Sequence, residues 1–255
     1  MSKLPAFEII GSREGAVAIM EKARNAKGAA KEIMARHKNV KSVLMKAGPR
    51  KGKYRKRAYR IIAGSKNTEV VHAESGCRFL LDVRKAYFSP RESTERMRIA
   101  EKVKPGEKVA VFFAGVGPFA IVIAKKAKPA KVTGIELNPS AVKYFRKNAT
   151  LNKVEDMVEI ERGDVKKLAT KYRGEFDRII MPLPEKAKEF LNSAEKCAKK
   201  NALIHYYCFC REDEIKAEKA KIRNSIKRRI NFLQVQKVLP WGPRIFKYRI
   251  DFRVY

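Results

Sequence analysis

The stretch that decides the fold reads VAVFFAGVGPF and runs from Val109 to Phe119. Its apolar first half predicts a buried strand, and the two glycines and the proline predict a tight turn that opens a helix. Gly115 and Gly117 let a ligand approach the main chain, and the N-terminus of the following helix favours a carboxylate or phosphate. Two glycines alone also suit an ordinary turn, so the surrounding pattern has to decide.

That surrounding pattern alternates short apolar segments with helical segments from Gly106 onward. The alternation is typical of βαβ units and predicts an α/β fold with a parallel sheet. The last apolar segment alternates aromatic and aliphatic residues with Arg, Lys and Asp, so we expect a half-buried strand there. The expected strands are 108–113, 132–136, 158–161, 178–181, 202–209 and 246–255, and the expected helices are 119–127, 140–151, 185–198 and 212–231.

The N-terminal part has a different organisation. We expect a helix over 29–37, strands over 40–45 and 58–62, and between these strands a basic loop, residues 47–57. Seven cations lie within residues 50–60, together with Tyr54 and Tyr59, a composition that suits phosphate contacts and base stacking. A solvated loop without a partner is the alternative. We divide the chain into a small α+β domain, 1–85, and a larger α/β domain, 86–255. The predicted RNA-binding residues are Arg50, Lys51, Lys53, Lys56, Arg57 and Arg91.

The composition narrows the class of partner. The chain has 255 residues, 59 Lys and Arg against 27 Asp and Glu, and a formal charge of +32. Because 45% of the residues are hydrophobic, the chain can bury a core, and its charge calls for a polyanion. Nucleic acid is the first candidate and an acidic membrane surface the second. The longest apolar stretch, 109–124, is broken by glycines and a proline and is shorter than the ~18–20 residues of a membrane span.

Neither a secretory signal nor a metal site is expected. The first eleven residues lack a basic patch followed by a long apolar region, so we expect a cytoplasmic protein. The four cysteines are too few and too unevenly spaced for a disulfide framework. Cys208 and Cys210 have no second ligand pair at zinc-like spacing, and packing is the simpler interpretation.

Two acidic residues strengthen the case for a cofactor. Glu136 ends the next expected strand, 21 positions after Gly115, where a carboxylate accepts hydrogen bonds from ribose hydroxyls. Asp164 ends the following strand and is placed to meet an adenine amine. Each alone also suits a helix N-cap, but together they favour an adenosine-containing ligand. Because the third glycine of the dinucleotide fingerprint is missing, the turn suits S-adenosylmethionine better than NAD.

Five motifs occur together in one order: YFSPR (87–91), TERMR (94–98), FAGVGPF (113–119), IELNP (135–139) and IHYY (204–207). With them the chain resembles the archaeal tRNA guanine-37 N1-methyltransferase family over nearly its whole length. The resemblance implies a class I, Rossmann-like S-adenosylmethionine-dependent methyltransferase domain preceded by a small RNA-binding domain. The chain starts at what resembles the family's second domain, so we expect the domain that grips the outer corner of tRNA in many members to be absent.

The resemblance implies methylation of guanine N1 next to the anticodon. N1 carries a proton at neutral pH, so the reaction needs a base and a group that stabilises charge on O6. The resemblance assigns these roles to Glu95 and Arg55. From the residues alone, Glu95 also suits a surface ion pair with Arg91 or Arg98, and Arg55 a phosphate contact. The cofactor residues that the resemblance implies are Tyr87, Phe113, Ala114, Gly115, Val116, Gly117, Glu136, Asn138 and Asp164.

Two positions depart from the family pattern. Val111 stands where many relatives have Asp, so we expect weaker cofactor binding or a substitute group. Pro182 stands where most have Asn, and proline offers a base edge neither donor nor acceptor. The chain is therefore similar to a bifunctional branch that also methylates C7 of 4-demethylwyosine to give isowyosine, with Pro182 in the base pocket. A rigid strand-to-helix turn is the alternative.

The sequence also offers candidate aromatic stacking residues and three histidines. The candidate stacking partners for an extruded base are Tyr206, Tyr207, Phe209 and Trp241, although aromatic residues near strands are more often core. His205 suits a packed strand histidine, and His37 and His72 show no partner arrangement. We expect a monomer. The alternatives to methyl transfer are aminocarboxypropyl transfer, as in a sister family, and a non-catalytic RNA-binding protein.

Overall fold

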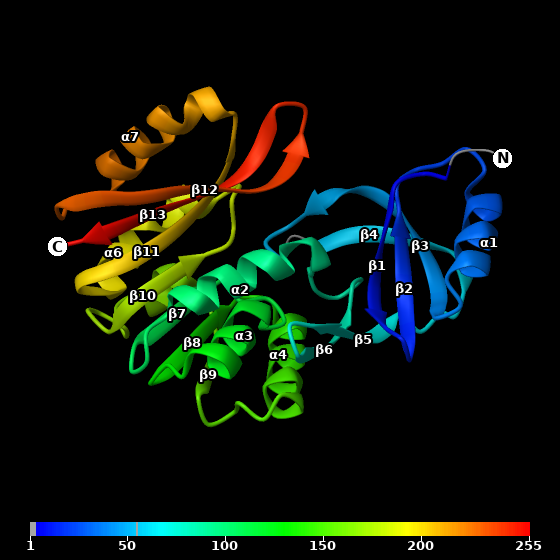
Figure 1. Ribbon diagram of the computed structural model, residues 1–255, viewed down its shortest axis with the longest axis horizontal. Helices are drawn as coiled ribbons and strands as arrows, with labels where there is room; N and C mark the ends of the chain where they lie inside the picture. Colours follow the sequence, from blue (N-terminus) through cyan, green and yellow to red (C-terminus); the bar gives the residue numbers. More distant parts are fainter. Residues whose placement is uncertain (1–3, 55) are drawn as a thin grey trace.

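A computed structural model describes residues 4–54 and 56–255, which form three sheets and their covering helices (Figure 1). The largest sheet has the strand order β12-β13-β11-β10-β7-β8-β9. The five strands from β11 to β9 in this order run parallel. Strand β13 pairs antiparallel with β11, and β12 pairs antiparallel with β13 at the edge of the sheet. This confirms the predicted α/β class. The strands are β7 (Lys108–Phe112), β8 (Lys131–Glu136), β9 (Val158–Arg162), β10 (Phe176–Met181), β11 (Ala198–Cys210), β12 (Ile230–Gly242) and β13 (Ile245–Val254).

The apolar run of β7 is explained by burial on both faces. Val109 and Val111 belong to the hydrophobic cluster under α2 (Ser93–Lys102), α3 (Pro118–Ala127) and α4 (Pro139–Leu151). Ala110 and Phe112 belong to the cluster on the opposite face, under α5 (Val165–Leu168), α6 (Leu191–Cys197) and α7 (Ile215–Ser225). A strand covered on both faces needs apolar residues at every position, which is why it shows no polar alternation.

The strand order reverses between β7 and β10, and ligands of open α/β sheets bind at such a reversal, beyond the carboxyl ends of the strands. The register pairs Ile180 of β10 with Val111 of β7, so its continuation brings Pro182 beside Phe113. On the other side of β7, Phe112 pairs with Ile135, which brings Glu136 beside Phe113. The fold therefore gathers the glycine turn, Glu136 and Pro182 at one edge.

The N-terminal unit is a four-stranded sheet with one helix, at the end of the molecule opposite the large sheet (Figure 1). It consists of β1 (Phe7–Ser12), β2 (Gly15–Met20), α1 (Ala26–Arg36), β3 (Val40–Lys51) and β4 (Lys56–Gly64). The prediction of a loop over 47–57 is wrong, because β3 and β4 extend into it as a basic hairpin and pair Lys51 with Lys56. Cross-strand hydrogen bonds satisfy this backbone, and the side chains of Lys53 and Lys56 are exposed.

A short hairpin, β5 (Glu69–Glu74) and β6 (Cys77–Asp82), lies between the two larger sheets (Figure 1). One hydrophobic cluster runs from Ile10 and Leu44 through Phe79 of this hairpin to Val111 and Tyr207. The core thus crosses the expected boundary at residues 85 and 86, and the division into two domains stays a prediction.

The C-terminal part also differs from expectation, as the N-terminal part does, where strands β1, β2, β5 and β6 were not predicted from sequence. The helix expected over 212–231 is only a short 3-10 turn (Glu212–Glu214) followed by α7, and the helix expected over 185–198 is a 3-10 turn (Ala187–Phe190) followed by α6. Strand β12 was not predicted from sequence. A further 3-10 turn (Pro90–Glu92) precedes α2. None of the helices in the described residues is long and apolar enough to cross a membrane.

Candidate active site

The turn after β7 depends on three residues with positive φ. Phe113, Gly115 and Gly117 have φ values of 57°, 59° and 90°. A Cβ on Gly117 would lie 2.1 Å from Cδ2 of Phe145, so only glycine fits there. A Cβ on Gly115 would meet only the carbonyl oxygen of Tyr87, at 3.7 Å. Gly117 is therefore required for packing against α4, whereas Gly115 leaves space beside Tyr87.

Glu136 holds this turn in place. Its Oε2 accepts a hydrogen bond from the Gly115 N–H at 2.8 Å, and its Oε1 accepts one from the Asn138 N–H at 2.6 Å. Burial raises the pKa of Glu136, and these backbone hydrogen bonds only partly oppose that effect. A desolvated carboxylate with lone pairs to spare suits a ligand that brings hydroxyl donors, as a ribose does.

Asn138 and Asp164 both serve as helix N-caps. Asn138 accepts from the Ser140 N–H at 3.1 Å and donates to the Lys85 carbonyl oxygen at 2.9 Å. Asp164 accepts from the Lys166 N–H at 2.9 Å. The N-cap alternative is thus what the hydrogen bonds give for these two side chains. Their contact with a cofactor stays a prediction.

Glu95 is buried, and the ion pair with Arg98 considered from sequence is present beside two further contacts that sequence did not suggest. Its side chain is 1% exposed, and its Oε1 accepts hydrogen bonds from the Tyr207 hydroxyl, at 2.7 Å, and from Arg249 Nη1. Oε2 is buried without a hydrogen-bond partner in the described residues, and Arg98 Nη1 lies 3.5 Å from it. Burial raises the pKa of Tyr207 well above its usual range, so this hydroxyl stays a donor. One carboxylate oxygen is saturated, and the other can accept a proton.

A second buried ion pair lies beside Glu95. Glu92 is paired with Lys247 at 2.9 Å, and the Tyr87 hydroxyl lies 3.5 Å from the same carboxylate. Lys247 Nζ also lies 4.7 Å from the ring centroid of Tyr207. The predicted cofactor residue Tyr87 is thereby connected to the surroundings of Glu95. Sequence reasoning missed Lys247 and Arg249, because the alternating charges of β13 were taken for a solvent face.

The two departures from the family pattern have plain structural surroundings. Val111 is fully buried in the apolar cluster on the α2 face of the sheet. Pro182 is half-buried, and the Leu183 N–H donates to the Met181 carbonyl oxygen at 2.8 Å, which closes a tight turn around Pro182. Phe190 packs edge-on against Phe113 nearby, at 4.7 Å between ring centroids. This geometry suits both interpretations of Pro182, the base pocket and the rigid turn.

The basic hairpin reaches the same region. Arg55 lies outside the described residues, as do the side chains of Arg50 and Lys51. Lys53 and Lys56 are exposed, with their Nζ atoms 5.0 and 5.8 Å from the ring centroid of Tyr54. A small pocket lies between the β4 strand of the hairpin and Tyr87, and it is lined by Lys56, Arg57, Tyr59, Val83, Arg84, Ala86 and Tyr87. Predicted RNA-binding and cofactor-binding residues are therefore neighbours.

Two of the four candidate stacking residues are core. Tyr206 and Tyr207 are buried, whereas Trp241 is 48% exposed and stacks on Phe209 at 4.2 Å between ring centroids. Arg91 is exposed and donates to the carbonyl oxygen of Pro240, next to Trp241, at 3.1 Å. The exposed tryptophan is thus tied to the loop that precedes α2.

One expectation about the histidines is confirmed and another is wrong. His205 is buried and hydrogen-bonded, as expected of a packed strand histidine. The expectation for His72 is wrong: its Nδ1 accepts from the Gly11 N–H at 3.2 Å, because β1 and β5 are adjacent. Across residues 4–54 and 56–255, no three His, Cys, Asp or Glu side chains are grouped to hold a metal ion.

Comparisons with known proteins identify the family of this chain. Residues 70–236 match the TRM5/TYW2 methyltransferase domain family. The chain is 43% identical to the tRNA (guanine(37)-N(1))-methyltransferase Trm5b of Pyrococcus abyssi, over 97% of this chain and 74% of that protein. The crystal structure of that enzyme superposes with a TM-score of 0.86, at 40% identity, covering 98% of this chain and 74% of the other.

Two further relatives carry different activities. The tRNA (guanine(37)-N(1))/4-demethylwyosine(37)-methyltransferase Taw22 of Nanoarchaeum equitans is 34% identical over 88% of this chain and 91% of its own length. A tRNA(Phe) (4-demethylwyosine(37)-C(7)) aminocarboxypropyltransferase of Pyrococcus horikoshii is 35% identical over 88% of this chain and 80% of its own length. Both activities act at position 37 of tRNA, according to their names.

Proposed function

This chain belongs to the TRM5/TYW2 methyltransferase family, and from that premise we propose that it transfers the methyl group of S-adenosylmethionine to N1 of guanosine 37 in tRNA. The observation that carries the proposal is the hydrogen bonding of Glu95: one oxygen is saturated by Tyr207 and Arg249, and the other, 3.5 Å from Arg98 Nη1, is buried and has no hydrogen-bond donor among the described residues. A base for guanine N1 needs such an open oxygen, held in a fixed orientation.

The cofactor is held in this proposal by the turn and the acidic residues around it. Glu136 accepts from the ribose hydroxyls, Asp164 meets the adenine, and Tyr87 and residues 113–117 surround the methionine end. S-adenosylmethionine supplies an electrophilic methyl group when bound. Support comes from the space beside Gly115 and from the desolvated carboxylate of Glu136.

The chain's own residues perform the proton chemistry. Oε2 of Glu95 takes the proton of guanine N1, and the N1 electron pair becomes available to the methyl group. Arg55, which lies outside the described residues, stabilises in this proposal the charge that develops on O6. Tyr207 and Arg249 hold the carboxylate in a fixed orientation through its other oxygen.

The small N-terminal unit, Arg91 and the basic hairpin form the RNA-binding surface in this proposal. Lys53 and Lys56 contact phosphates, and the hairpin lies next to Tyr87 across the small pocket that both line. A base in the anticodon loop leaves its stack at lower cost than one in a duplex. We place the reaction in the cytoplasm and take the enzyme to act as a monomer.

A second methylation, at C7 of 4-demethylwyosine, is proposed because of Pro182. It stands beside Phe113 at the carboxyl end of β10, where it offers no hydrogen bond that would restrict the pocket to one guanine edge. The similarity to the bifunctional Nanoarchaeum equitans enzyme supports this extension. Pro182→Asn should change the ratio of the two products, measured with unmodified tRNA and with tRNA carrying 4-demethylwyosine. An identical ratio would leave the rigid turn as the role of Pro182.

The main test uses labelled S-adenosylmethionine to identify the group that is transferred to tRNA. The protein is incubated with tRNA and with cofactor labelled either on the methyl group or on the carboxypropyl carbons, and the digested RNA is analysed. Methyl label in 1-methylguanosine is the expected result. Label from the chain carbons alone would identify an aminocarboxypropyltransferase, and no label from either would favour a non-catalytic RNA-binding protein.

Glu95→Gln tests the assigned base. Turnover should fall by about 10²–10⁴, the usual contribution of general base catalysis, while tRNA affinity is retained. Glu195→Gln is the matched control, since Glu195 is a buried carboxylate on α6 that binds the backbone of Lys227 and Arg228. Equal loss of tRNA binding and turnover in Glu95→Gln would indicate a structural role.

A further inference from the structure

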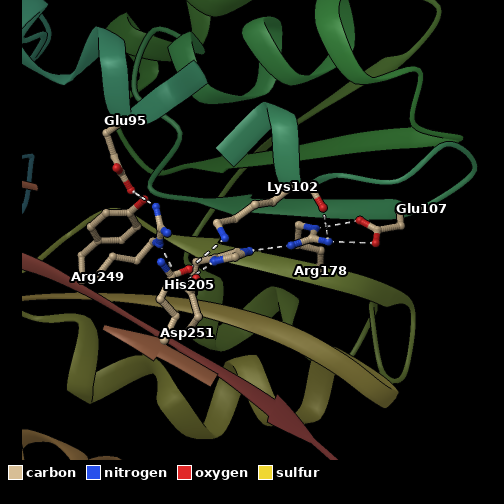
Figure 2. Close-up of polar contacts among 9 residues, drawn as sticks. Glu95, Lys102, Glu107, Arg178, His205, Arg249 and Asp251 are labelled. Atoms are coloured by element: carbon tan, nitrogen blue, oxygen red, sulfur yellow. Dashed lines mark hydrogen bonds and ion pairs between the residues drawn. The ribbon is translucent and has the colours of Figure 1, made fainter. Parts of the chain in front are cut away.

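A line of buried charged and polar side chains leads from Glu95 across the sheet (Figure 2). Arg249 of β13 contacts Glu95 with Nη1 and donates from Nε to Asp251 Oδ1 at 2.8 Å. His205 of β11 lies 2.7 Å from the same oxygen through Nδ1, and its Nε2 lies 2.7 Å from Arg178 Nη1. The line thus joins α2 to three adjacent strands, and its members are buried.

The far end of the line is held rigidly. Arg178 of β10 forms a two-point contact with Glu107, at 2.7 and 2.9 Å, and donates to the carbonyl oxygen of Lys102, the last residue of α2, at 2.6 Å. Such a two-point contact fixes the plane of a guanidinium. Both ends of the line are therefore attached to α2 or to the loop that follows it.

Arg178 also determines the tautomer of His205. A guanidinium only donates, so Nε2 of His205 accepts, and Nδ1 carries the proton that it donates to Asp251. Burial lowers the pKa of His205, which keeps the ring neutral. Although burial opposes it, the hydrogen bond from His205 and the charge of Arg249 hold the pKa of Asp251 below its usual range. Asp251 is thus a fixed negative charge.

This arrangement places the Arg249 cation between two carboxylates, Glu95 and Asp251. The remaining charged or titratable groups near Glu95 are Arg98 on its own helix, 3.5 Å away, Tyr207 on β11, and the Glu92 to Lys247 pair. The last pair is internally neutralised. Arg249 is therefore the cation in contact with the saturated oxygen of Glu95, and the negative charge of Asp251 partly neutralises it.

We propose that Arg249 is a positioning residue for Glu95, and that Asp251, oriented by His205 and Arg178, sets how strongly Glu95 holds the proton of guanine N1. The inference rests on the proposed function, because it assumes that Glu95 is the base. Arg249 favours the carboxylate that accepts the proton, and Asp251 limits this effect so that the carboxylate is still basic enough to take it.

The two charges predict opposite shifts. Arg249→Gln removes the cation, so the acidic limb of the pH profile for single-turnover methyl transfer should move to higher pH, by about one to three units. Asp251→Asn keeps the shape of the side chain but removes the negative charge that partly neutralises Arg249. The full charge of Arg249 then acts on Glu95, so the acidic limb should move to lower pH. Arg249→Lys keeps a cation and should return most of the shift of Arg249→Gln. General damage to the fold would not move the limb in opposite directions.

The experiment measures these profiles with unmodified tRNA, with Glu195→Gln as the buried carboxylate control, for which no shift is expected. If Arg249→Gln does not fold, the shift of Asp251→Asn decides alone. Methyl transfer by the wild type with an unmoved limb in Asp251→Asn, or a limb moved to higher pH, would overturn the inference and leave the proposed function intact. Absence of methyl transfer by the wild type at every pH would overturn the proposed function and this inference with it.

Discussion

Asn148 connects three parts of the molecule with one buried side chain. Its Oδ1 accepts from the Leu80 N–H at 2.7 Å, and its Nδ2 donates to the carbonyl oxygens of Leu80, at 3.1 Å, and Val116, at 3.0 Å. Leu80 belongs to β6, Asn148 to α4, and Val116 to the turn that we assign to the cofactor. The side chain thus acts as a cross-strand partner for β6 and as a brace for the turn.

Asn148→Ala should therefore affect stability and cofactor binding together. Three hydrogen bonds are lost, and each contributes roughly 1 kcal/mol net, so the free energy of unfolding should fall by about 3 kcal/mol. Equilibrium denaturation by urea measures this loss. Calorimetric titration with S-adenosylmethionine should also show weaker binding, because the Val116 carbonyl loses its donor.

Asn152 offers a matched control one helical turn later. It accepts from the Arg78 N–H at 2.9 Å and donates to the carbonyl oxygens of Arg78 and Asn148, both at 2.7 Å, but among the described residues it has no hydrogen bond to the turn after β7. Asn152→Ala also removes three hydrogen bonds, so it should destabilise the protein by about 3 kcal/mol and leave cofactor affinity unchanged. A loss below about 1 kcal/mol in Asn148→Ala, or equal loss of cofactor affinity in both variants, would refute the reasoning.

Three further outcomes are expected. Burial raises the pKa of Glu136, so the stability it contributes is present at low pH and is lost as the pH rises through that raised value, whereas ribose donors favour the ionised form; cofactor affinity should therefore rise with pH over the same window, and a flat calorimetric profile would contradict the ribose contact. Gly117→Ala should cost roughly 2–4 kcal/mol by urea denaturation, because its Cβ meets Phe145 at positive φ, and Gly115→Ala, which meets no such neighbour, should cost less. Trp241 is the single tryptophan and is exposed, so an anticodon stem-loop RNA that stacks on it should quench the fluorescence, and unchanged emission at saturating RNA would exclude that contact.

Local sequence signals predicted the parts of the fold that local physics decides. The segment from Val109 to Phe119 forms the strand, turn and helix expected of it, because apolar residues, positive-φ glycines and a proline each restrict the backbone by themselves. The acidic residue Glu136 also lies beside this turn, as its spacing from Gly115 predicted. Both results depend on short sequence separations and on the regular geometry of βαβ units.

Signals that depend on distant partners could not be interpreted in the same way. The composition of the basic run 47–57 predicts a loop, yet its strands pair in a hairpin. The pairing register of two strands cannot be predicted from the sequence of either strand alone. Glu95 and Arg249 are 154 positions apart, and only the packing of α2 on β13 brings them together. Alternation along β13 identified a strand correctly, but it could not say that both faces would be covered.

The same distinction separates the two uses of positive charge in this protein. Buried cations such as Arg249, Arg178 and Lys247 each face a carboxylate, because an unpaired charge cannot be desolvated at tolerable cost. They contribute nothing to the excess of +32, which must therefore come from cations without an acidic partner. Exposed lysines such as Lys53 and Lys56 are of this kind, since the described residues give them contacts with Tyr54 and no ion pair. The net charge is thus a property of the surface that RNA would meet, while the paired charges inside serve the carboxylate that we assign to the reaction.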